Sequence, residues 1–386
     1  MITRLEVDGF KSLRDFEIDF EPFTVLVGPN GAGKSNILEA LGLISRLGDH
    51  RAPEDALKQG RGRASDQFWR HAQESVRSMR LAVETLEPDA DRADSQKWAA
   101  RYRHELQLTR NGVGASERVQ FKNMPVQSIA TAQDPWLAAH AEWHGLTDWP
   151  RDPPTLGEGI DFLPAFSLLQ LNAAQLREAS ERIDTGDLAP DASNLPTVLA
   201  GLPADVLGDV RAELAGLIPG ISDFDLVEHD ESYQIEFRTR DGDVVPARLA
   251  SDGTLRMLAL LTAVVGKLSW NSIVCIEEPE NGIYPGRLRR LIDLLREATS
   301  SAAWRAGTVD RPPPQVIVTT HSPVFLTALK DHPQAIRYID VIRKDRCRVT
   351  RARPLATGPG VDPAKLVSLR EIDAVLGGVW SSEGDR

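Results

Sequence analysis

Two adjacent glutamates, Glu277 and Glu278, follow directly after an apolar run of strand length, residues 273–276. Neighbouring carboxylates repel each other, so this pair is expected mainly where a cation lies beside it. The chemistry that such a pair offers is metal binding by one carboxylate and activation of a water molecule by the other. Taken alone, the pattern is equally that of a strand running into an exposed acidic turn.

The segment GPNGAGKS, residues 28–35, fits the pattern G-x-x-x-x-G-K-[ST] and lies between an apolar run and a helical pattern. Its glycines allow the backbone to approach phosphate oxygens closely, and the start of the helix adds positive partial charge. We therefore predict a nucleoside triphosphate site with Mg²⁺. Its predicted residues are Gly28, Pro29, Asn30, Gly31, Ala32, Gly33, Lys34, Ser35 and Asn36.

This site supplies a cation for the two glutamates. Lys34 is expected to reach the β- and γ-phosphates of ATP, and the Ser35 hydroxyl is expected to bind Mg²⁺. Glu277 is the predicted second Mg²⁺ ligand. Glu278 is then free to orient or deprotonate the attacking water.

Two further stretches carry residue types that bind phosphate. In LASDGTLRML, Ser251 and Gly253 precede an apolar helical pattern, so they fit either an anion site or an ordinary helix N-cap. In VIVTTHSP, His321 follows an apolar strand, where an imidazole can contact a γ-phosphate or simply face solvent. Neither stretch decides the function by itself.

The composition is that of a globular protein with a sizeable core: 386 residues, 41% hydrophobic and 26% charged. We expect no membrane association and no secretion signal, because no apolar run approaches the ~20 residues of a membrane span. The two cysteines, Cys275 and Cys347, suit a reducing, cytoplasmic compartment. A net charge of −11 argues against a constitutive, general nucleic-acid binder.

The pattern of apolar residues predicts an α/β fold. Residues 16–23 alternate apolar and acidic side chains, as in a half-buried antiparallel strand. Continuous apolar runs at 23–27, 273–276 and 316–320 predict strands buried on both faces of a mostly parallel sheet. Helical patterns dominate residues 174–218, and Asp241-Gly242 is typical of a hairpin turn.

Taken together, these motifs resemble the ABC-type ATPase heads of the SMC/RecF-like group, and most closely the stand-alone AAA-type ATPases related to the OLD family. The resemblance covers most of the chain. It rests on GFKSL near the start, the P-loop, DASNLPTVL at 191–199, SDGT, EEPENG and THSP, in this order.

The resemblance implies one ABC-type head with a central mostly parallel sheet, an antiparallel edge sheet and an inserted helical lobe. Residues 1–46 and 230–330 would form the nucleotide-binding core, and residues 47–229 an inserted lobe of strands and helices. Residues 331–386 would form a C-terminal hairpin and helix.

The resemblance also implies roles for individual residues. Ser251 and Gly253 would act as the signature motif that completes the ATP site of a second protomer. His321 would be the switch histidine, and Lys11 and Ser12 would contact the nucleotide. Gln170 is a candidate for the glutamine loop near the metal.

Two positions in the glutamate motif depart from the pattern of the family. Glu277 stands where aspartate is commoner, and Tyr284 where relatives often have histidine. Neither change removes a group that hydrolysis needs, although a slow turnover is expected.

Asn281 would belong to the loop that contacts the partner protomer.

The function that these observations predict is an ATP-hydrolysing switch. Its homodimer, either constitutive or formed only with ATP, would close head to head with ATP and control a separate effector protein, such as a nuclease, in DNA repair or anti-phage defence. A non-catalytic ATP-gated scaffold is the main alternative. A transporter ATPase subunit is disfavoured because Ser251 follows Lys34 by 217 residues, more than such subunits usually need.

DNA is a possible partner. One basic group lies near the C-terminus and another opens a helical pattern, although clustered arginines are usually solvated or paired with carboxylates. The two groups comprise Arg343, Lys344, Arg346, Arg348, Arg351 and Arg353, and Arg287, Arg289 and Arg290.

Overall fold

The structure is a computed structural model of the 386-residue chain. It describes residues 1–48, 53–71, 74–88, 98–109, 115–125, 147–148, 165–182, 187–266, 272–300, 314–344, 347–355, 366–368 and 372.

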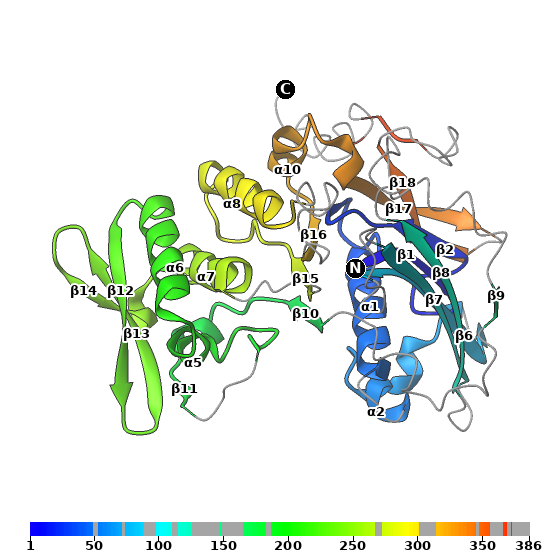
Figure 1. Cartoon of the computed structure of the whole chain (residues 1–386), viewed down its shortest axis with the longest axis horizontal. Helices are drawn as coiled ribbons and strands as arrows, with labels where there is room; N and C mark the ends of the chain where they lie inside the picture. Colours follow the sequence, from blue (N-terminus) through cyan, green and yellow to red (C-terminus); the bar gives the residue numbers. More distant parts are fainter. Residues whose placement is uncertain are drawn as a thin grey trace, which may run out of the picture.

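A six-stranded sheet forms the centre of the molecule, with strand order β10-β15-β16-β3-β17-β18 (Figure 1). The strands from β10 to β17 are parallel to their neighbours, and β18 is antiparallel to β17. Their bounds are β3 Phe23–Val27, β10 Ala165–Leu169, β15 Ser272–Glu277, β16 Gln315–Thr320, β17 Ile336–Lys344 and β18 Cys347–Pro354. The mostly parallel central sheet that the sequence predicts is confirmed.

Alternate side chains of the central strands enter two different cores. Val25 and Val27 of β3 belong to one hydrophobic cluster, whereas Leu26 between them belongs to the other. In β15, Val274 and Cys275 are divided in the same way. Because successive side chains of a strand point to opposite faces, the unbroken apolar runs serve both layers.

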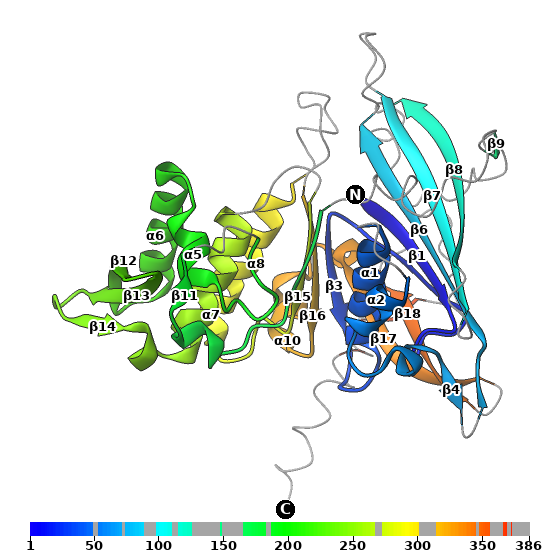
Figure 2. The same cartoon turned by 90° about the horizontal axis from the view of Figure 1, so that it is seen from below.

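The first face of the central sheet is covered by helix α1, Lys34–Gly48, and by an antiparallel sheet (Figure 2). The strand order of that sheet is β2-β1-β6-β7-β8-β9. Its strands are β1 Ile2–Asp8, β2 Phe16–Asp19, β6 Ser78–Pro88, β7 Trp98–Thr109, β8 Ala115–Pro125 and β9 Thr147–Asp148. The short helix α2, Pro53–Lys58, and the small ribbon of β4, Arg70–His71, and β5, Glu74–Ser75, accompany it.

The second face is covered by helices α7, Asp252–Leu261, α8, Pro285–Ala298, and α10, Pro323–Ala328. A lobe lies beyond them, at the end of the molecule opposite the antiparallel sheet (Figure 1). It consists of helices α5, Leu195–Ala200, and α6, Ala204–Leu217, and a small sheet of order β11-β13-β12 with β14 beside β13. The strands are β11 Ser180–Glu181, β12 Ile221–His229, β13 Ser232–Thr239 and β14 Val244–Pro246.

The described strands among residues 47–229 belong to four sheets, one of which is the small β4–β5 ribbon. Strands β6 to β8 extend the N-terminal antiparallel sheet, because β6 pairs with β1. Strand β10 returns to the centre and pairs with β15. Strand β12 pairs with β13, so the lobe continues past residue 229. The division of the chain into domains therefore stays a prediction. Its predicted limits do not coincide with the ends of these sheets.

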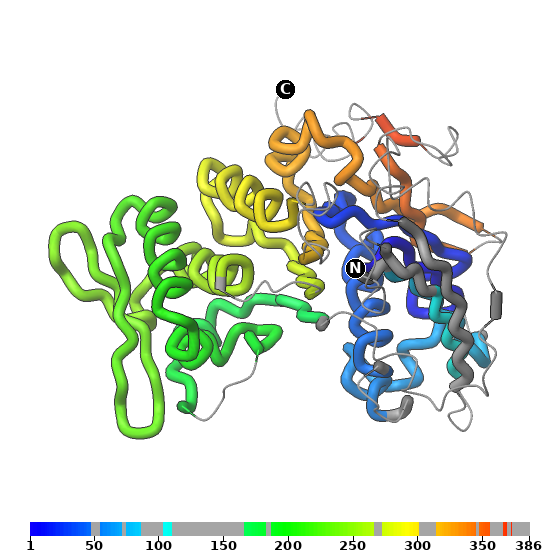
Figure 3. Tube along the Cα trace, in the orientation of Figure 1, coloured from blue at the N-terminus to red at the C-terminus, as the bar shows by residue number. Residues whose placement is uncertain are grey.

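The two ends of the described chain meet in the central sheet. Strand β17 pairs with β3, and the N-terminal and C-terminal segments lie side by side (Figure 3). The predicted hairpin after residue 331 is present as β17 and β18. The last predicted helix lies almost wholly outside the described residues. Among the helices that the structure describes, none combines the length and apolar composition needed to cross a membrane.

Candidate nucleotide-binding and hydrolysis site

The P-loop connects β3 to α1 and requires glycine at two positions. Gly33 has φ +100°, and a Cβ there would lie 2.1 Å from the Thr350 hydroxyl oxygen. A Cβ on Gly28 would lie 2.1 Å from the carbonyl oxygen of Ile339. The loop is therefore packed tightly against the C-terminal hairpin. Its backbone can adopt this turn only because Gly28 and Gly33 have no side chain.

Lys34 begins helix α1 and is almost wholly buried. Its Nζ donates hydrogen bonds to the carbonyl oxygens of Gly28, at 2.7 Å, and Pro29, at 3.0 Å. Burial lowers the pKa of Lys34, and the nearby Glu278, Glu280 and Glu277 carboxylates oppose that shift. The side chain is thus a poorly hydrated cation held against the P-loop, suited to an anionic ligand.

Glu277 ends β15 and is bound by two residues from neighbouring elements. The Ser35 hydroxyl donates to Glu277 Oε1. Gln170, which directly follows β10, donates from Nε2 to Glu277 Oε2 over 2.6 Å. Three separately predicted residues therefore converge at the carboxyl end of the parallel strands, the edge where such sheets bind ligands.

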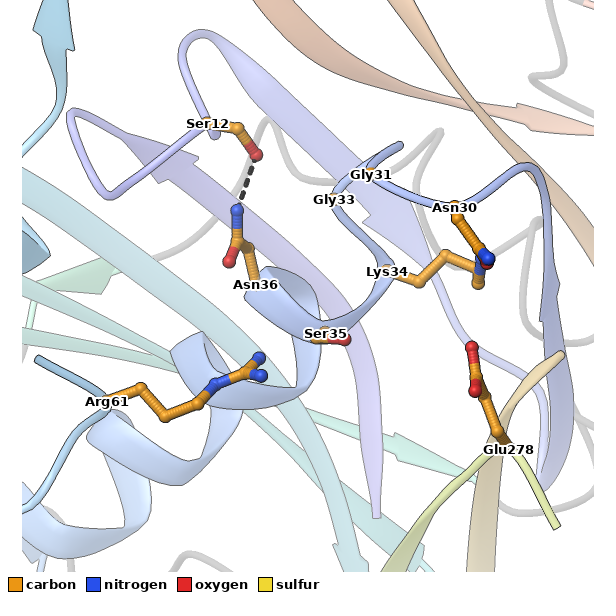
Figure 4. Close-up of a pocket in the computed structure, with 9 residues that line it drawn as sticks. All are labelled: Ser12, Asn30, Gly31, Gly33, Lys34, Ser35, Asn36, Arg61 and Glu278. Atoms are coloured by element: carbon orange, nitrogen blue, oxygen red, sulfur yellow. Dashed lines mark hydrogen bonds between the residues drawn. The ribbon is translucent and has the colours of Figure 1, made fainter. Parts of the chain in front are cut away.

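Glu278 lies across the pocket from Lys34 and Asn30 (Figure 4). Its φ is +46°, a left-handed conformation that non-glycine residues rarely adopt. Its backbone N–H donates to the Thr319 carbonyl oxygen at 3.0 Å, and its side-chain Oε2 accepts from Asn281 Nδ2 at 3.0 Å. These contacts hold the turn in a sparsely populated conformation, as is frequent at functional sites.

The pocket between these residues has a volume of about 330 Å³. It is lined by Ser12, Asn30, Gly31, Gly33, Lys34, Ser35, Asn36, Arg61 and Glu278. Most of these residues were predicted from the sequence.

His321 follows β16, next to the Glu278 turn. Its Nδ1 lies 3.5 Å from Glu278 Oε1 and 3.5 Å from Glu280 Oε1. The structure therefore brings the predicted base and the predicted switch histidine together. Glu280, which the sequence analysis did not single out, is as close to His321 Nδ1 as Glu278 is.

Ser12 and Lys11 contact different residues of helix α1. Ser12 Oγ accepts from Asn36 Nδ2 at 2.8 Å and lines the pocket (Figure 4). The Lys11 ammonium instead forms an ion pair with Glu39 of α1 and is not among the described lining residues. Ser12 therefore lies at the predicted nucleotide pocket, whereas contact between Lys11 and a nucleotide stays a prediction.

Besides Glu280, two residues of the site were missed by sequence reasoning. Arg61 pairs with Glu39 and lines the pocket, but its segment GRGR reads only as a loop. Thr350 Oγ1 donates to the Ala32 carbonyl oxygen at 2.9 Å, across a separation of 318 residues. No local pattern could have indicated a contact of that sequence distance.

Ser251 and Gly253 are placed together, but away from the P-loop pocket. Ser251 is the exposed N-cap of α7, and its Oγ accepts from the Thr254 N–H at 3.2 Å. A Cβ on Gly253 would lie 2.3 Å from the carbonyl oxygen of Gly282, so this turn packs against the loop after the glutamates. Neither residue is among the described residues that line the pocket.

Three of the six basic residues near the C-terminus have carboxylate partners in the described part of the chain. Arg351 and Arg353 both bind Asp340, and Lys344 binds Asp15. Arg343 and Arg348 instead lie directly opposite each other in the β17–β18 ladder, and the described part of the chain shows no ion pair for either.

In the second basic group, Arg290 binds Glu213. Arg346 lies outside the described residues. Carboxylate pairing thus accounts for three members of the first basic group and for Arg290 in the second.

The donor set fits a magnesium nucleotide. The Ser35 hydroxyl and the Glu277 carboxylate, which meet directly, are the oxygen ligands that Mg²⁺ prefers. The backbone of the P-loop is free of side chains at Gly28 and Gly33, where a Cβ would clash. Lys34 supplies the adjacent positive charge.

Short regions of the chain are similar to several curated proteins. They are 43% identical over 56 residues to the DNA replication and repair protein RecF of Streptomyces avermitilis, and 49% identical over 49 residues to the OLD nuclease of Thermus scotoductus. A third match is 51% identical over 45 residues to structural maintenance of chromosomes protein 1 of Schizosaccharomyces pombe. These matches cover 14%, 13% and 11% of this chain, and 15%, 9% and 4% of the relatives.

Solved structures resemble the chain over nearly its whole length. An Smc head bound to the C-terminal winged-helix domain of ScpA gives a TM-score of 0.54 at 19% identity, covering 92% of this chain and 98% of that one. The Pyrococcus furiosus Smc head with an extended coiled coil gives 0.51 at 15% identity, covering 98% and 99%. At these identities the likeness establishes the fold alone.

The fold, the site and these similarities define an ABC-type ATPase head of the SMC/RecF-like group. Residues 23–327 match the family described as "AAA domain, putative AbiEii toxin, Type IV TA system". The chain belongs to this AAA-domain family.

Proposed function

We propose that this protein is an ATP-driven switch, which binds and hydrolyses ATP and controls a separate effector protein. The observation that carries the proposal is the convergence on Glu277. Ser35 of the P-loop and Gln170 of the neighbouring strand both bind that carboxylate, while Glu278 faces Lys34 across the pocket.

Each residue has a distinct task in this proposal. Lys34 and the P-loop N–H groups bind the phosphates, and Ser35 with Glu277 would hold Mg²⁺. Mg²⁺, when bound, neutralises charge on the β- and γ-phosphate oxygens. Glu278 orients the attacking water and accepts its proton. His321 lies beside Glu278, where its ring can contact the terminal phosphate.

The position of the signature residues supports the proposal of a head-to-head homodimer. Ser251 caps the exposed N-terminus of α7, a position suited to an anion, yet it is not among the described residues that line the pocket of its own chain. In the closed dimer, Ser251 and Gly253 of each protomer would complete the ATP site of the other. ATP would thus favour the closed state by binding it more tightly than the open one.

The effector is proposed to be a separate chain, such as a nuclease, in DNA repair or anti-phage defence. Support comes from the names of the similar proteins, which include a DNA replication and repair protein and a nuclease. DNA itself is a proposed ligand of the closed dimer. Arg343 and Arg348 are the arginines best suited to contact it, because they lie opposite each other without described carboxylate partners.

Phosphate release from ATP tests the enzymatic part of the proposal. The wild-type protein should release phosphate slowly and only with Mg²⁺. Lys34→Ala should abolish binding of a fluorescent ATP analogue, whereas Glu278→Gln should bind it and release phosphate at least ~100-fold more slowly. Equal hydrolysis by wild type and Glu278→Gln would refute the assignment of the base, and would favour a non-catalytic ATP-gated scaffold if both rates were negligible.

A further inference from the structure

Glu280 ties the glutamate turn to the end of β16. Its carboxylate is 9% exposed. Glu280 Oε1 accepts a hydrogen bond from the Thr320 hydroxyl at 2.6 Å and another from the His321 backbone N–H at 3.0 Å. Thr320 and His321 therefore hold this carboxylate in place.

The imidazole of His321 faces two carboxylates at the same distance. Its Nδ1 lies 3.5 Å from Oε1 of Glu280 and 3.5 Å from Oε1 of Glu278. Within the described part of the chain, Nδ1 is buried without a hydrogen-bond partner, and so is the second oxygen of Glu280. An unsatisfied buried donor or acceptor is costly, so a small rotation that joins His321 to one of the carboxylates is favourable.

The two carboxylates differ in how firmly they are held. Glu280 is anchored by Thr320 and by the His321 N–H, whereas Glu278 is 30% exposed and faces the pocket. The other oxygen of Glu278, Oε2, accepts a hydrogen bond from Asn281 Nδ2. If His321 bound to Glu278, that carboxylate would lose the oxygen through which it could reach a water molecule.

We propose that Glu280 is the positioning residue of the site, which accepts the Nδ1–H of His321 and so leaves Glu278 free to act on water. The hydrogen bond fixes the tautomer of the ring and leaves Nε2 for contact with the substrate. This inference rests on the proposed ATPase function. It adds a residue for which neither the motif nor the comparisons assign a role.

Steady-state kinetics of Glu280→Gln test the proposal. Glutamine keeps an acceptor for Thr320 and the His321 N–H but presents an amide that can donate to Nδ1. We expect kcat to fall at least about tenfold with KM unchanged. Thr320→Val should shift kcat in the same direction by less, and Glu213→Gln, a carboxylate on the exposed face of α6, should change nothing.

A double-mutant cycle separates a positioning role from a merely structural one. In a His321→Ala background, Glu280→Gln should lower kcat less than twofold, because its effect passes through the imidazole. An equal loss in both backgrounds, or a large rise in KM, would overturn the proposal.

The tautomer of His321 gives a readout that does not depend on hydrolysis. Nitrogen-15 NMR of the wild-type protein should show the proton on Nδ1, and Glu280→Gln should move it to Nε2. A tautomer that is the same in both proteins overturns the role of Glu280 even if the ATPase is active. Absence of hydrolysis with the expected tautomer change would instead overturn the proposed function alone.

Discussion

Gln170 and Glu277 lie 107 residues apart in the chain and meet at the carboxyl end of the central sheet, where Gln170 Nε2 donates to Glu277 Oε2 over 2.6 Å. The contact follows from the pairing of β10 with β15, in which Leu169 lies opposite Ile276. The residues that follow these two are therefore brought side by side. An amide is thereby fixed on the carboxylate that would hold Mg²⁺.

Gln170→Ala should lower the apparent affinity of the site for Mg²⁺ without lowering its affinity for ATP. Loss of the amide leaves Glu277 oriented only by Ser35, so the Mg²⁺ concentration for half-maximal hydrolysis should rise about tenfold. A Mg²⁺ titration of phosphate release measures this. Gln175→Ala, at an exposed position of the following turn, is the matched control. An unchanged titration for Gln170→Ala would remove Gln170 from the site.

Gly33→Ala should both destabilise the protein and abolish nucleotide binding. The new Cβ would meet the Thr350 hydroxyl at 2.1 Å in a backbone with φ +100°, so we expect a loss of more than about 1 kcal/mol in the free energy of unfolding. Urea unfolding measures it. Gly208→Ala, on the open surface of helix α6, should stabilise by about 1 kcal/mol instead. A neutral Gly33→Ala would contradict the tight packing of the loop.

The stability of the protein should depend on Lys34 at alkaline pH. Because burial lowers the pKa of folded Lys34 below its ordinary value of 10.5, the unfolded chain retains this proton at pH values where the folded chain has released it. In that window stability rises with pH. The free energy of unfolding of wild type, relative to Lys34→Met, should therefore increase as the pH approaches 10.5 from below. Urea unfolding across this range should show no such rise if Lys34 is well hydrated.

Arg177 should link the segment after Gln170 to the turn that contains Ser251 and Gly253. It lies seven residues after Gln170, donates to the Ala250 carbonyl oxygen at 3.2 Å, and forms an ion pair with Asp252. Its hydrogen bond also lowers the pKa of Asp252. Arg177→Ala should thus reduce ATP-dependent dimerisation severalfold while leaving the affinity of the monomer for ATP unchanged.

Sedimentation of the Arg177→Ala protein with and without ATP measures this coupling. Arg182→Ala removes a comparable ion pair, with Glu228 on the exposed edge of the lobe, and should leave dimerisation unaffected. Identical dimerisation by both variants would show that the Asp252 contact is structurally incidental.

The extent to which the sequence predicted the structure follows from the range of each interaction. Lys34 and Ser35 were predictable because the P-loop is a local pattern, and the central strands because their apolar runs are continuous. Gln170 was only a candidate, since its partner Glu277 is brought to it by sheet pairing alone. Thr350 and Arg61 carried no local signal, because they reach the loop through tertiary packing.

The extent of the inserted lobe was also beyond local patterns. Strand β6 alternates like any half-buried strand, and only its pairing with β1 assigns it to the N-terminal sheet. Glu280 was read as part of a motif, but its contacts with Thr320 and His321 depend on the distance between two strand ends. Pairing partners of strands distant in sequence are the information that the single sequence lacks.

The solution mass of Glu278→Gln, measured by light scattering with and without Mg²⁺-ATP, tests the central claim most directly. The proposed switch predicts a monomer without nucleotide that doubles its mass with Mg²⁺-ATP, and loss of that doubling when Ser251→Arg blocks the exposed turn. A monomer mass both with and without Mg²⁺-ATP, in a protein that demonstrably binds the nucleotide, would contradict an ATP-driven closure of two heads.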